Sequence, residues 1–349
     1  MAAQRIVNPI SSSAPELVSY FGCVQAEEYA LTKWSLGLRL PGSTDLTIEA
    51  GFNKGDILRT HLLRPTWHFV APADIRWMLK LTAPRVNAAN AFMYRKSELD
   101  SKVFARSEKV ILKALSGDKY LTRNELNAVL KKHKIEAGGF RLSYIMMHAE
   151  LEALICSGPR HGNQFTYALL DERVPATKAM DRQDALAELA SRYFRSRGPA
   201  TIKDFSTWSG LTVTDCKNAV KYIEETIMME VVDGNTYYFN TETTVQKKTP
   251  DSLYLLPPYD ELIMGYKERG AVMLFRDSLK SNPAFRHDSM IMWNGQVIGT
   301  WKRTMQPRQA HFETDVFRPL TTAQQKAFQK CVIRFSEFSD IKTGKIKFG

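Results

Sequence analysis

The sequence predicts an α+β protein made of three tandem winged helix-turn-helix units, followed by a small C-terminal β-barrel with a terminal helix. Two neighbouring stretches repeat the same series of helices and a β-hairpin, a looser copy precedes them, and the last part of the chain is rich in strand signals. The chain has 349 residues, of which 44% are apolar and 24% charged, so it is long enough to form several domains with sizeable cores.

The first unit is the loosest copy. Its elements follow in the order helix, strand, helix, helix, strand, strand, at residues 14–21, 23–25, 27–37, 46–52, 57–63 and 66–70. A long helix over residues 72–91 then leads to the next unit. The periodicity in this part of the chain is that of short amphipathic helices and half-buried strands.

The second and third units are clearer. Thr122 and Glu125 form a capping-box signature at the start of a helix in the second unit, and Thr201 opens the equivalent helix in the third. Around them, the second unit has helices at 106–115 and 141–153 and strands at 154–156 and 164–169, and the third has helices at 185–195 and 214–225 and strands at 227–232 and 236–239. The two copies align at a spacing of 72 residues, with Glu152 opposite Glu224. Three helices followed by a hairpin is the order of a winged helix-turn-helix.

The C-terminal part begins after a polar segment at residues 246–251. Strands are predicted at 253–256, 289–293, 297–302 and 311–317, and Asn294-Gly295 is a strong hairpin signal. A helix at 321–338 closes the chain. We therefore divide the sequence into domains at residues 1–98, 99–176, 177–248 and 249–349.

The charge balance points to a polyanionic partner. Lys and Arg number 48 against 37 Asp and Glu, which leaves a net charge of +11. This favours nucleic acid over a membrane surface, with an inert basic surface as the alternative. The chain has neither an apolar run of transmembrane length nor a secretion signal, so we expect no membrane contact.

Cysteine and histidine spacing gives no metal signature. The four cysteines, Cys23, Cys156, Cys216 and Cys331, are scattered and are expected to be reduced and mostly buried. Glycine-rich nucleotide motifs are also missing from the sequence. We predict no metal, no cofactor, a monomer and a cytoplasmic, nucleoid-associated location.

Candidate DNA contacts lie in two hairpins. In the second unit, Arg160 and His161 occupy the tip of the wing, where they can bind phosphate, whereas Asp233 makes the next tip acidic. A solvated turn is the alternative for Arg160 and His161.

The hairpin of the first unit is basic and aromatic. Its candidate DNA contacts are Arg59, His61, Arg64, Trp67 and His68. In a strand, Arg59 and His61 project from one face and the leucines beside them from the other, so the basic face can grip a backbone or wedge a base step. Trp67 can instead belong to the core.

Several segments resemble the AlkZ/YcaQ-type winged-helix DNA glycosylases. They are VQAEEY at 24–29, LLRPTWHFV at 62–70, LTAPRV at 81–86, LPPYDE at 256–261, GYKER at 265–269 and GTWKR at 299–303. The resemblance covers nearly the whole chain. It implies removal of alkylated purines and unhooking of interstrand crosslinks in damaged duplex DNA, through a Gln-apolar-Gln or Gln-apolar-Asp motif. Here the matching residues are Gln25, Ala26 and Glu27, and Glu27 fits neither version but keeps the carboxylate of the second.

The chemistry of the pair suits that reaction. Cleavage of an N-glycosidic bond passes through an oxocarbenium-like sugar, which a carboxylate such as Glu27 stabilises while it activates water. The amide of Gln25 can hold that water. Residues two apart share a face only in an extended segment, which Cys23 and Val24 favour. Alternatively, Gln25 bonds neighbouring backbone and Glu27 lies in the first turn of a helix.

A second carboxylate of interest is Asp260, beside Glu261. It can face the DNA cleft or hold Lys267 and Arg269, two further candidate DNA contacts, and a structural ion pair is the alternative. No lysine stands beside Gln25 and Glu27 to form a Schiff base, so we expect a monofunctional DNA glycosylase. A non-catalytic DNA-binding protein, such as a transcriptional regulator, is the competing hypothesis.

Overall fold

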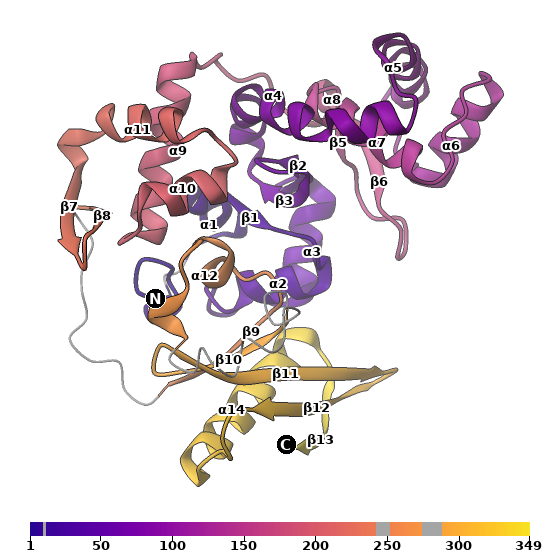
Figure 1. Cartoon of the computed structure of the whole chain (residues 1–349). Coiled ribbons are helices and arrows are strands. Elements are labelled where there is room, and N and C mark those ends of the chain that lie inside the picture. The colour runs from indigo at the N-terminus through magenta and orange to yellow at the C-terminus, as the bar shows by residue number, and fades with distance from the viewer. Residues whose placement is uncertain (10–11, 242–251, 274–287) are drawn as a thin grey trace.

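The computed structural model describes residues 1–9, 12–241, 252–273 and 288–349 (Figure 1). The first group of elements comprises α1 (Ala14–Phe21), β1 (Cys23–Gln25), α2 (Tyr29–Gly37), α3 (Asp45–Lys54), β2 (Leu58–Leu62) and β3 (Thr66–Val70). Its three strands form an antiparallel sheet in the order β1-β3-β2. Ser13 and Thr44 cap α1 and α3, which fixes where these helices begin.

The second group repeats this arrangement. After the long helix α4 (Pro72–Lys96) come α5 (Ser101–Leu115), β4 (Leu121–Thr122), α6 (Arg123–Lys132), α7 (Phe140–Leu151), β5 (Ile155–Ser157), β6 (Thr166–Leu169) and the short α8 (Leu170–Arg173). The sheet order β4-β6-β5 corresponds strand for strand to that of the first group. The expected capping box of Thr122 and Glu125 is present at the start of α6.

The third group follows the same order with a shorter first strand. It comprises α9 (Arg182–Arg197), α10 (Ile202–Ser209), α11 (Val213–Lys221), β7 (Ile227–Val232) and β8 (Asn235–Asn240). A single bridge between Ala200 and Tyr238 stands where the other groups have a strand. The expected boundary at residues 246–251 lies outside the described residues.

The C-terminal sheet differs from the expected barrel. It is formed by β9 (Leu253–Leu256), β10 (Met290–Trp293), β11 (Gln296–Gln306), β12 (Gln309–Val316) and β13 (Lys342–Lys347), with α12 (Glu261–Met264) after β9 and α14 (Thr322–Ser339) before β13. The order β13-β12-β11-β10-β9 is open, because the edge strands β13 and β9 do not pair within the described residues. The barrel prediction is therefore wrong for this part of the chain, and β13 was not predicted at all.

The sheet of the first group lies between two cores. Val24 and Phe69 belong to a core shared with the C-terminal sheet and α14, whereas Leu58 and Leu62 belong to a core shared with α4 and the third group. Both faces are buried, so strand β1 is held by elements from three parts of the chain. A separate core forms inside the second group.

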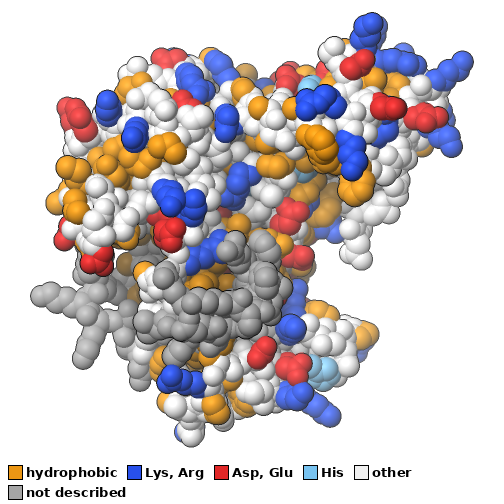
Figure 2. All heavy atoms as spheres, viewed as in Figure 1, with side chains coloured by type: hydrophobic (Ala, Val, Ile, Leu, Met, Phe, Trp, Pro, Cys, Tyr) orange, Lys and Arg blue, Asp and Glu red, His pale blue; other side chains and the backbone are white. Residues whose placement is uncertain are grey.

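Two lobes stand apart on one side of the molecule. One carries α5, α6 and α7, the other carries the long β11–β12 hairpin, and the surface between them is hollowed (Figures 1 and 2). The first of these lobes is covered with exposed basic side chains, namely Lys102, Arg106, Lys109, Lys113, Lys119, Arg123, Lys131, Lys132 and Lys134. Within the described ranges, no helix has the length and apolar character needed to cross a bilayer.

Candidate active site

Gln25 and Glu27 stand at the end of β1. Gln25 is the last residue of the strand and pairs with His68 of β3. Glu27 lies in a bend, because α2 begins only at Tyr29. Gln25 is buried, with 3% of its surface exposed, whereas Glu27 is exposed. The segment is thus extended at Gln25, as the sequence favours, and Glu27 is not in the first turn of the helix.

The bend is tied to strand β3 through Trp67. The backbone N–H of Ala26 donates to the carbonyl oxygen of Trp67 over 2.7 Å, and the N–H of Trp67 donates to Oε2 of Glu27 over 3.1 Å. The other carboxylate oxygen of Glu27, Oε1, has no hydrogen-bond partner among the described residues. This oxygen is available to a substrate or a water molecule.

The amide of Gln25 is oriented by Arg64. Nη2 of Arg64 donates to Oε1 of Gln25 over 3.0 Å, and Nη1 donates to the carbonyl oxygen of Thr207 over 3.1 Å. A guanidinium can only donate, so the amide oxygen must face Arg64 and the amide nitrogen must point elsewhere. In the described part of the chain that nitrogen has no partner.

The backbone of Gln25 is held by Glu261. Oε1 of Glu261 accepts from the N–H of Gln25 over 2.7 Å. Its Oε2 accepts from Nη2 of Arg197 over 2.6 Å and from Nε1 of Trp208 over 3.2 Å. The third group and the C-terminal part therefore meet at the end of β1. Sequence reasoning missed Arg197 and Trp208, because neither belongs to a recognisable motif.

Asp260 does not face a cleft. Its side chain is fully buried, and it accepts from both Nη atoms of Arg39, over 2.9 and 2.8 Å, and from the hydroxyl of Ser35 over 2.6 Å. The Arg39 guanidinium and these hydrogen bonds hold the pKa of Asp260 below its usual value despite its burial. The structure therefore supports the alternative of an internal ion pair.

Tyr259 stands beside the candidate site. Burial and the nearby charges of Glu27 and Glu28 raise the pKa of its hydroxyl. Its φ of 61° is in the left-handed region, which an aromatic residue seldom adopts. Such backbone strain is concentrated at functional sites. No local pattern distinguishes this tyrosine within the LPPYDE segment.

His68 is internal rather than a DNA contact. Its side chain is fully buried, and Nδ1 lies 3.0 Å from the carbonyl oxygen of Thr66, which can only accept. The ring therefore carries its proton on Nδ1. Burial and the neighbouring charge of Arg64 hold the pKa of His68 well below its ordinary value, so it is neutral at pH 7.

Arg59 and His61 are also buried, with 7% exposed each. They share a face, as predicted, but this face packs on the second group instead of lying open to DNA. Nε of Arg59 donates to the carbonyl oxygen of Ala26 over 3.0 Å, and burial lowers the pKa of Arg59 to about 10. The predicted exposed grip is therefore wrong for these two residues.

Cations and aromatic rings alternate where the first two groups meet. The guanidinium of Arg59 lies 4.2 Å from the ring centre of Trp67 and 4.6 Å from that of Phe165. The guanidinium of Arg160 lies 4.2 Å from the ring centre of the same Phe165 and 5.0 Å from that of Tyr29. Contacts of this kind stabilise both partners when they are desolvated. Arg160 is thus half-buried and packed.

The remaining candidate contacts differ in exposure. His161 and Lys267 are exposed, and so is Asp233 at the tip of the third group. Arg269 is half-buried, and its Nε donates to the carbonyl oxygen of Ile263 over 3.0 Å. Of the predicted DNA contacts, His161 and Lys267 are therefore the most accessible.

The described residues contain no cluster of three or more side chains suited to a metal ion. Cys23, Cys156 and Cys216 are buried free thiols, and Cys331 is partly buried, as the sequence led us to expect. Burial raises the pKa of these thiols, which leaves them protonated and unreactive.

The chain was compared with known proteins. The family described as DNA glycosylase AlkZ-like matches residues 18–338. The solved structure of the DNA glycosylase AlkZ from Streptomyces sahachiroi is similar, with a TM-score of 0.81 and 18% sequence identity over 99% of this chain and 96% of that one. A search of the curated proteins found no match. Because the family match spans nearly the whole sequence, this protein belongs to the AlkZ-like DNA glycosylase family.

Proposed function

We propose that this protein hydrolyses the N-glycosidic bond of alkylated purines in duplex DNA, including purines joined in interstrand crosslinks. The observation that carries the proposal is the carboxylate of Glu27. It is exposed, it is fixed through Oε2 by the Trp67 backbone, and Oε1 has no partner among the described residues. A carboxylate held in this way is suited to act on a sugar or a water molecule that approaches from outside.

The reaction needs little else from the protein. An N-alkylated purine is cationic and leaves with the electron pair of the glycosidic bond, so a strong general acid is unnecessary. The sugar becomes an oxocarbenium ion, and the negative charge of Glu27 stabilises it. Water then adds to C1′ and passes a proton to the carboxylate, which yields an abasic site and a free base.

Gln25 is suited to place that water. Arg64 engages the amide oxygen, so the amide nitrogen is the group left to donate. Glu261 fixes the backbone of the same residue. Preorganised donors of this kind lower the barrier without reorganisation during the reaction.

The product is expected to be an abasic site without strand cleavage. A lyase step needs a neutral amine that attacks C1′ to form a Schiff base. The nearest lysine along the chain, Lys33, has its Nζ 2.7 Å from a carboxylate oxygen of Asp45 and 2.7 Å from one of Glu49. These two ion pairs hold the Lys33 amine against α3 and do not leave it free to attack C1′. This supports a monofunctional enzyme.

The surface is suited to duplex DNA. The three groups share the helix and sheet order of winged helix-turn-helix domains, and we propose that they act as such. The net charge of +11 and the hollow between the two lobes fit a polyanion (Figure 2). Exposed Lys and Arg side chains would bind phosphates without reading sequence.

The direct test is base release. Duplex DNA with N7-methylguanine, or with a nitrogen-mustard crosslink, is incubated with the protein, and free base and alkali-labile sites are measured. We expect both to form, without strand breaks before alkali. Release of no base from any alkylated duplex would refute the enzyme and leave the non-catalytic DNA-binding protein as the function.

A further inference from the structure

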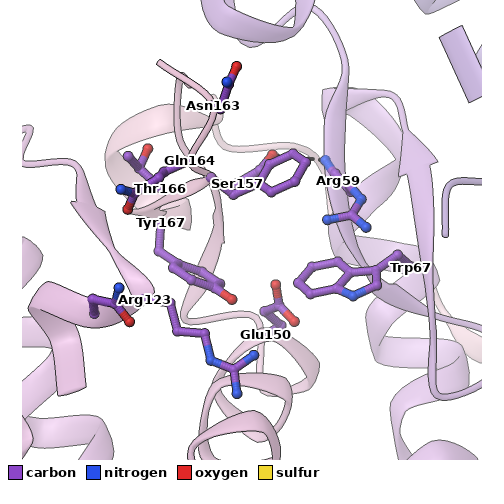
Figure 3. Close-up of a pocket in the computed structure, with 11 residues that line it drawn as sticks. Arg59, Trp67, Arg123, Glu150, Ser157, Asn163, Gln164, Thr166 and Tyr167 are labelled. Atoms are coloured by element: carbon purple, nitrogen blue, oxygen red, sulfur yellow. Dashed lines mark hydrogen bonds between the residues drawn. The ribbon is translucent and has the colours of Figure 1, made fainter. Parts of the chain in front are cut away.

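A cavity of about 350 Å³ opens between the β2–β3 hairpin and the second group (Figure 3). Arg59 and Trp67 line one side, Tyr167 and Arg123 line the other, and Glu150 from α7 lies between them. This volume is within the range of about 300–1,000 Å³ that is typical of small-molecule sites. Aromatic faces, donors and a carboxylate thus converge on one space.

Glu150 is the unusual member of this cavity. Its side chain is completely buried, and Oε2 is bonded to Nδ1 of His61. The other oxygen, Oε1, is buried without any hydrogen-bond partner in the described part of the chain. A buried carboxylate oxygen that accepts no hydrogen bond is energetically costly. A ligand with an N–H group could donate to this oxygen and remove that cost.

The two walls of the cavity on either side of Glu150 carry hydrogen-bond donors. Arg59 uses Nε on the carbonyl oxygen of Ala26 and Nη2 on that of Glu27, over 3.0 and 3.5 Å. Its Nη1 has no acceptor among the described residues. Arg123 is exposed at the rim, and its Nη2 donates to the hydroxyl of Ser143 over 2.6 Å. The rings of Trp67, Phe165 and Tyr167 line the same cavity and give it an apolar wall.

This combination matches a purine with both donor and acceptor edges. Guanine has N–H groups that can donate to a carboxylate and an O6 atom that can accept from a guanidinium. Adenine lacks that oxygen. The cavity also adjoins the candidate site, because Trp67 donates to Glu27 over 3.1 Å and Arg59 reaches the Glu27 carbonyl.

We propose that this cavity is a purine-base site, preferring guanine and N7-alkylguanine, that receives the base beside Glu27. The inference rests on the proposed function, since it names where the substrate base goes. It gives Glu150 the part of a base-binding residue, and it implies that the base leaves the DNA stack before or as it is released.

Calorimetry on the full chain with free bases tests this site. We expect 7-methylguanine and guanine to bind and adenine to bind about 10-fold more weakly, the usual effect of one lost hydrogen bond to a charged group. Glu150→Gln should weaken binding of 7-methylguanine by about 10-fold. The matched control is Glu108→Gln, since Glu108 pairs with Nδ1 of His148 over 2.8 Å outside the cavity. It should bind like the wild type.

Arg123→Ala gives a second variant that should fold normally, because this side chain is exposed. It should also weaken 7-methylguanine binding. No binding to the wild type at millimolar base, or full binding by both Glu150→Gln and Arg123→Ala, would overturn the proposal.

The two proposals can fail separately. Gln25→Ala and Glu27→Gln should still bind 7-methylguanine, because neither residue lines the cavity. A wild type that binds the free base but releases none from damaged DNA would contradict the proposed function alone. A wild type that releases base from DNA but binds no free base would contradict the purine site alone.

Discussion

Nη2 of Arg64 lies 3.0 Å from Oε1 of Gln25, and through this contact the RPTWH segment sets the orientation of the amide at the end of β1. The same guanidinium bonds the carbonyl oxygen of Thr207 in α10. Arg64 therefore joins the third group to the candidate active site, and we propose that it is a positioning residue. Its predicted role as a DNA contact is not needed to explain its place in the fold.

Replacing Arg64 tests this role. Arg64→Met should slow base release by about 10-fold or more, because the amide of Gln25 is then free to rotate. Arg64→Lys should recover part of the rate, since one donor is restored. In a Gln25→Ala background, Arg64→Met should cause little further loss, because the two residues act together. Multiplicative losses in single-turnover kinetics would show that Arg64 acts independently of Gln25.

Arg59 is expected to matter for stability. Arg59→Ala removes a buried guanidinium and its contacts with Trp67 and Phe165, and should lower the free energy of unfolding by about 2–4 kcal/mol. Arg123→Ala, at an exposed position, should change it by no more than about 0.5 kcal/mol. Denaturant titration measures both. If Arg59→Ala left stability intact but weakened DNA binding, Arg59 would be a DNA contact after all.

Local signals made most of the fold predictable. Ala14–Phe21, Cys23–Gln25 and Thr66–Val70 were expected at the residues where they occur, and Thr122 and Thr201 cap the helices that they were expected to open. These features depend on neighbours within a few residues, which hydrophobic periodicity and capping chemistry report directly.

Long-range contacts were not predictable. Glu261 meets the backbone of Gln25 across 236 residues, and no local pattern indicates that pairing. Arg59 was expected at the surface because a lone hairpin exposes one face, but the second group covers that face. The open C-terminal sheet and its parallel edge strand β13 likewise depend on a strand that lies beyond a helix.

Lys267 tests the direction from which DNA approaches. This side chain is exposed after α12, so Lys267→Ala should weaken binding to any duplex. For one lost phosphate contact, the slope of the logarithm of the binding constant against the logarithm of the salt concentration should become shallower by about 0.9. Lys330→Ala on α14, which lies at the far edge of the C-terminal lobe, should leave the slope unchanged (Figure 1). Equal salt dependence of DNA binding for the wild type and Lys267→Ala would show that Lys267 does not contact DNA.

The buried His68 predicts a loss of stability in acid. Its pKa is lowered in the folded state, so below the ordinary pKa of about 6.5 the unfolded chain binds the extra proton. The free energy of unfolding should therefore keep its highest value above pH ~6.5. It should fall as the pH is lowered, by up to about 1.4 kcal/mol per pH unit. Denaturant titrations between pH 7.5 and 5.5 should show that the free energy of unfolding changes less steeply with pH in His68→Gln than in the wild type.

The exposed His161 supplies the control for this titration. His161→Gln should keep the pH dependence of the wild type, because this side chain is exposed and does not belong to the core that buries His68. If the free energy of unfolding fell as steeply with pH in His68→Gln as in the wild type, other groups would cause the acid sensitivity.

The most direct test of the account is the rate of base release by Glu27→Gln. This change keeps size and hydrogen bonding, removes the negative charge, and creates the Gln-apolar-Gln form that the family resemblance implies. The matched control is Glu28→Gln at the adjacent exposed glutamate. Single-turnover release of N7-methylguanine from a duplex should be slowed by about 100-fold or more in Glu27→Gln, with nearly unchanged DNA affinity, and little affected in Glu28→Gln. A Glu27→Gln variant as active as the wild type would contradict the role of the carboxylate and leave water positioning by amides as the mechanism.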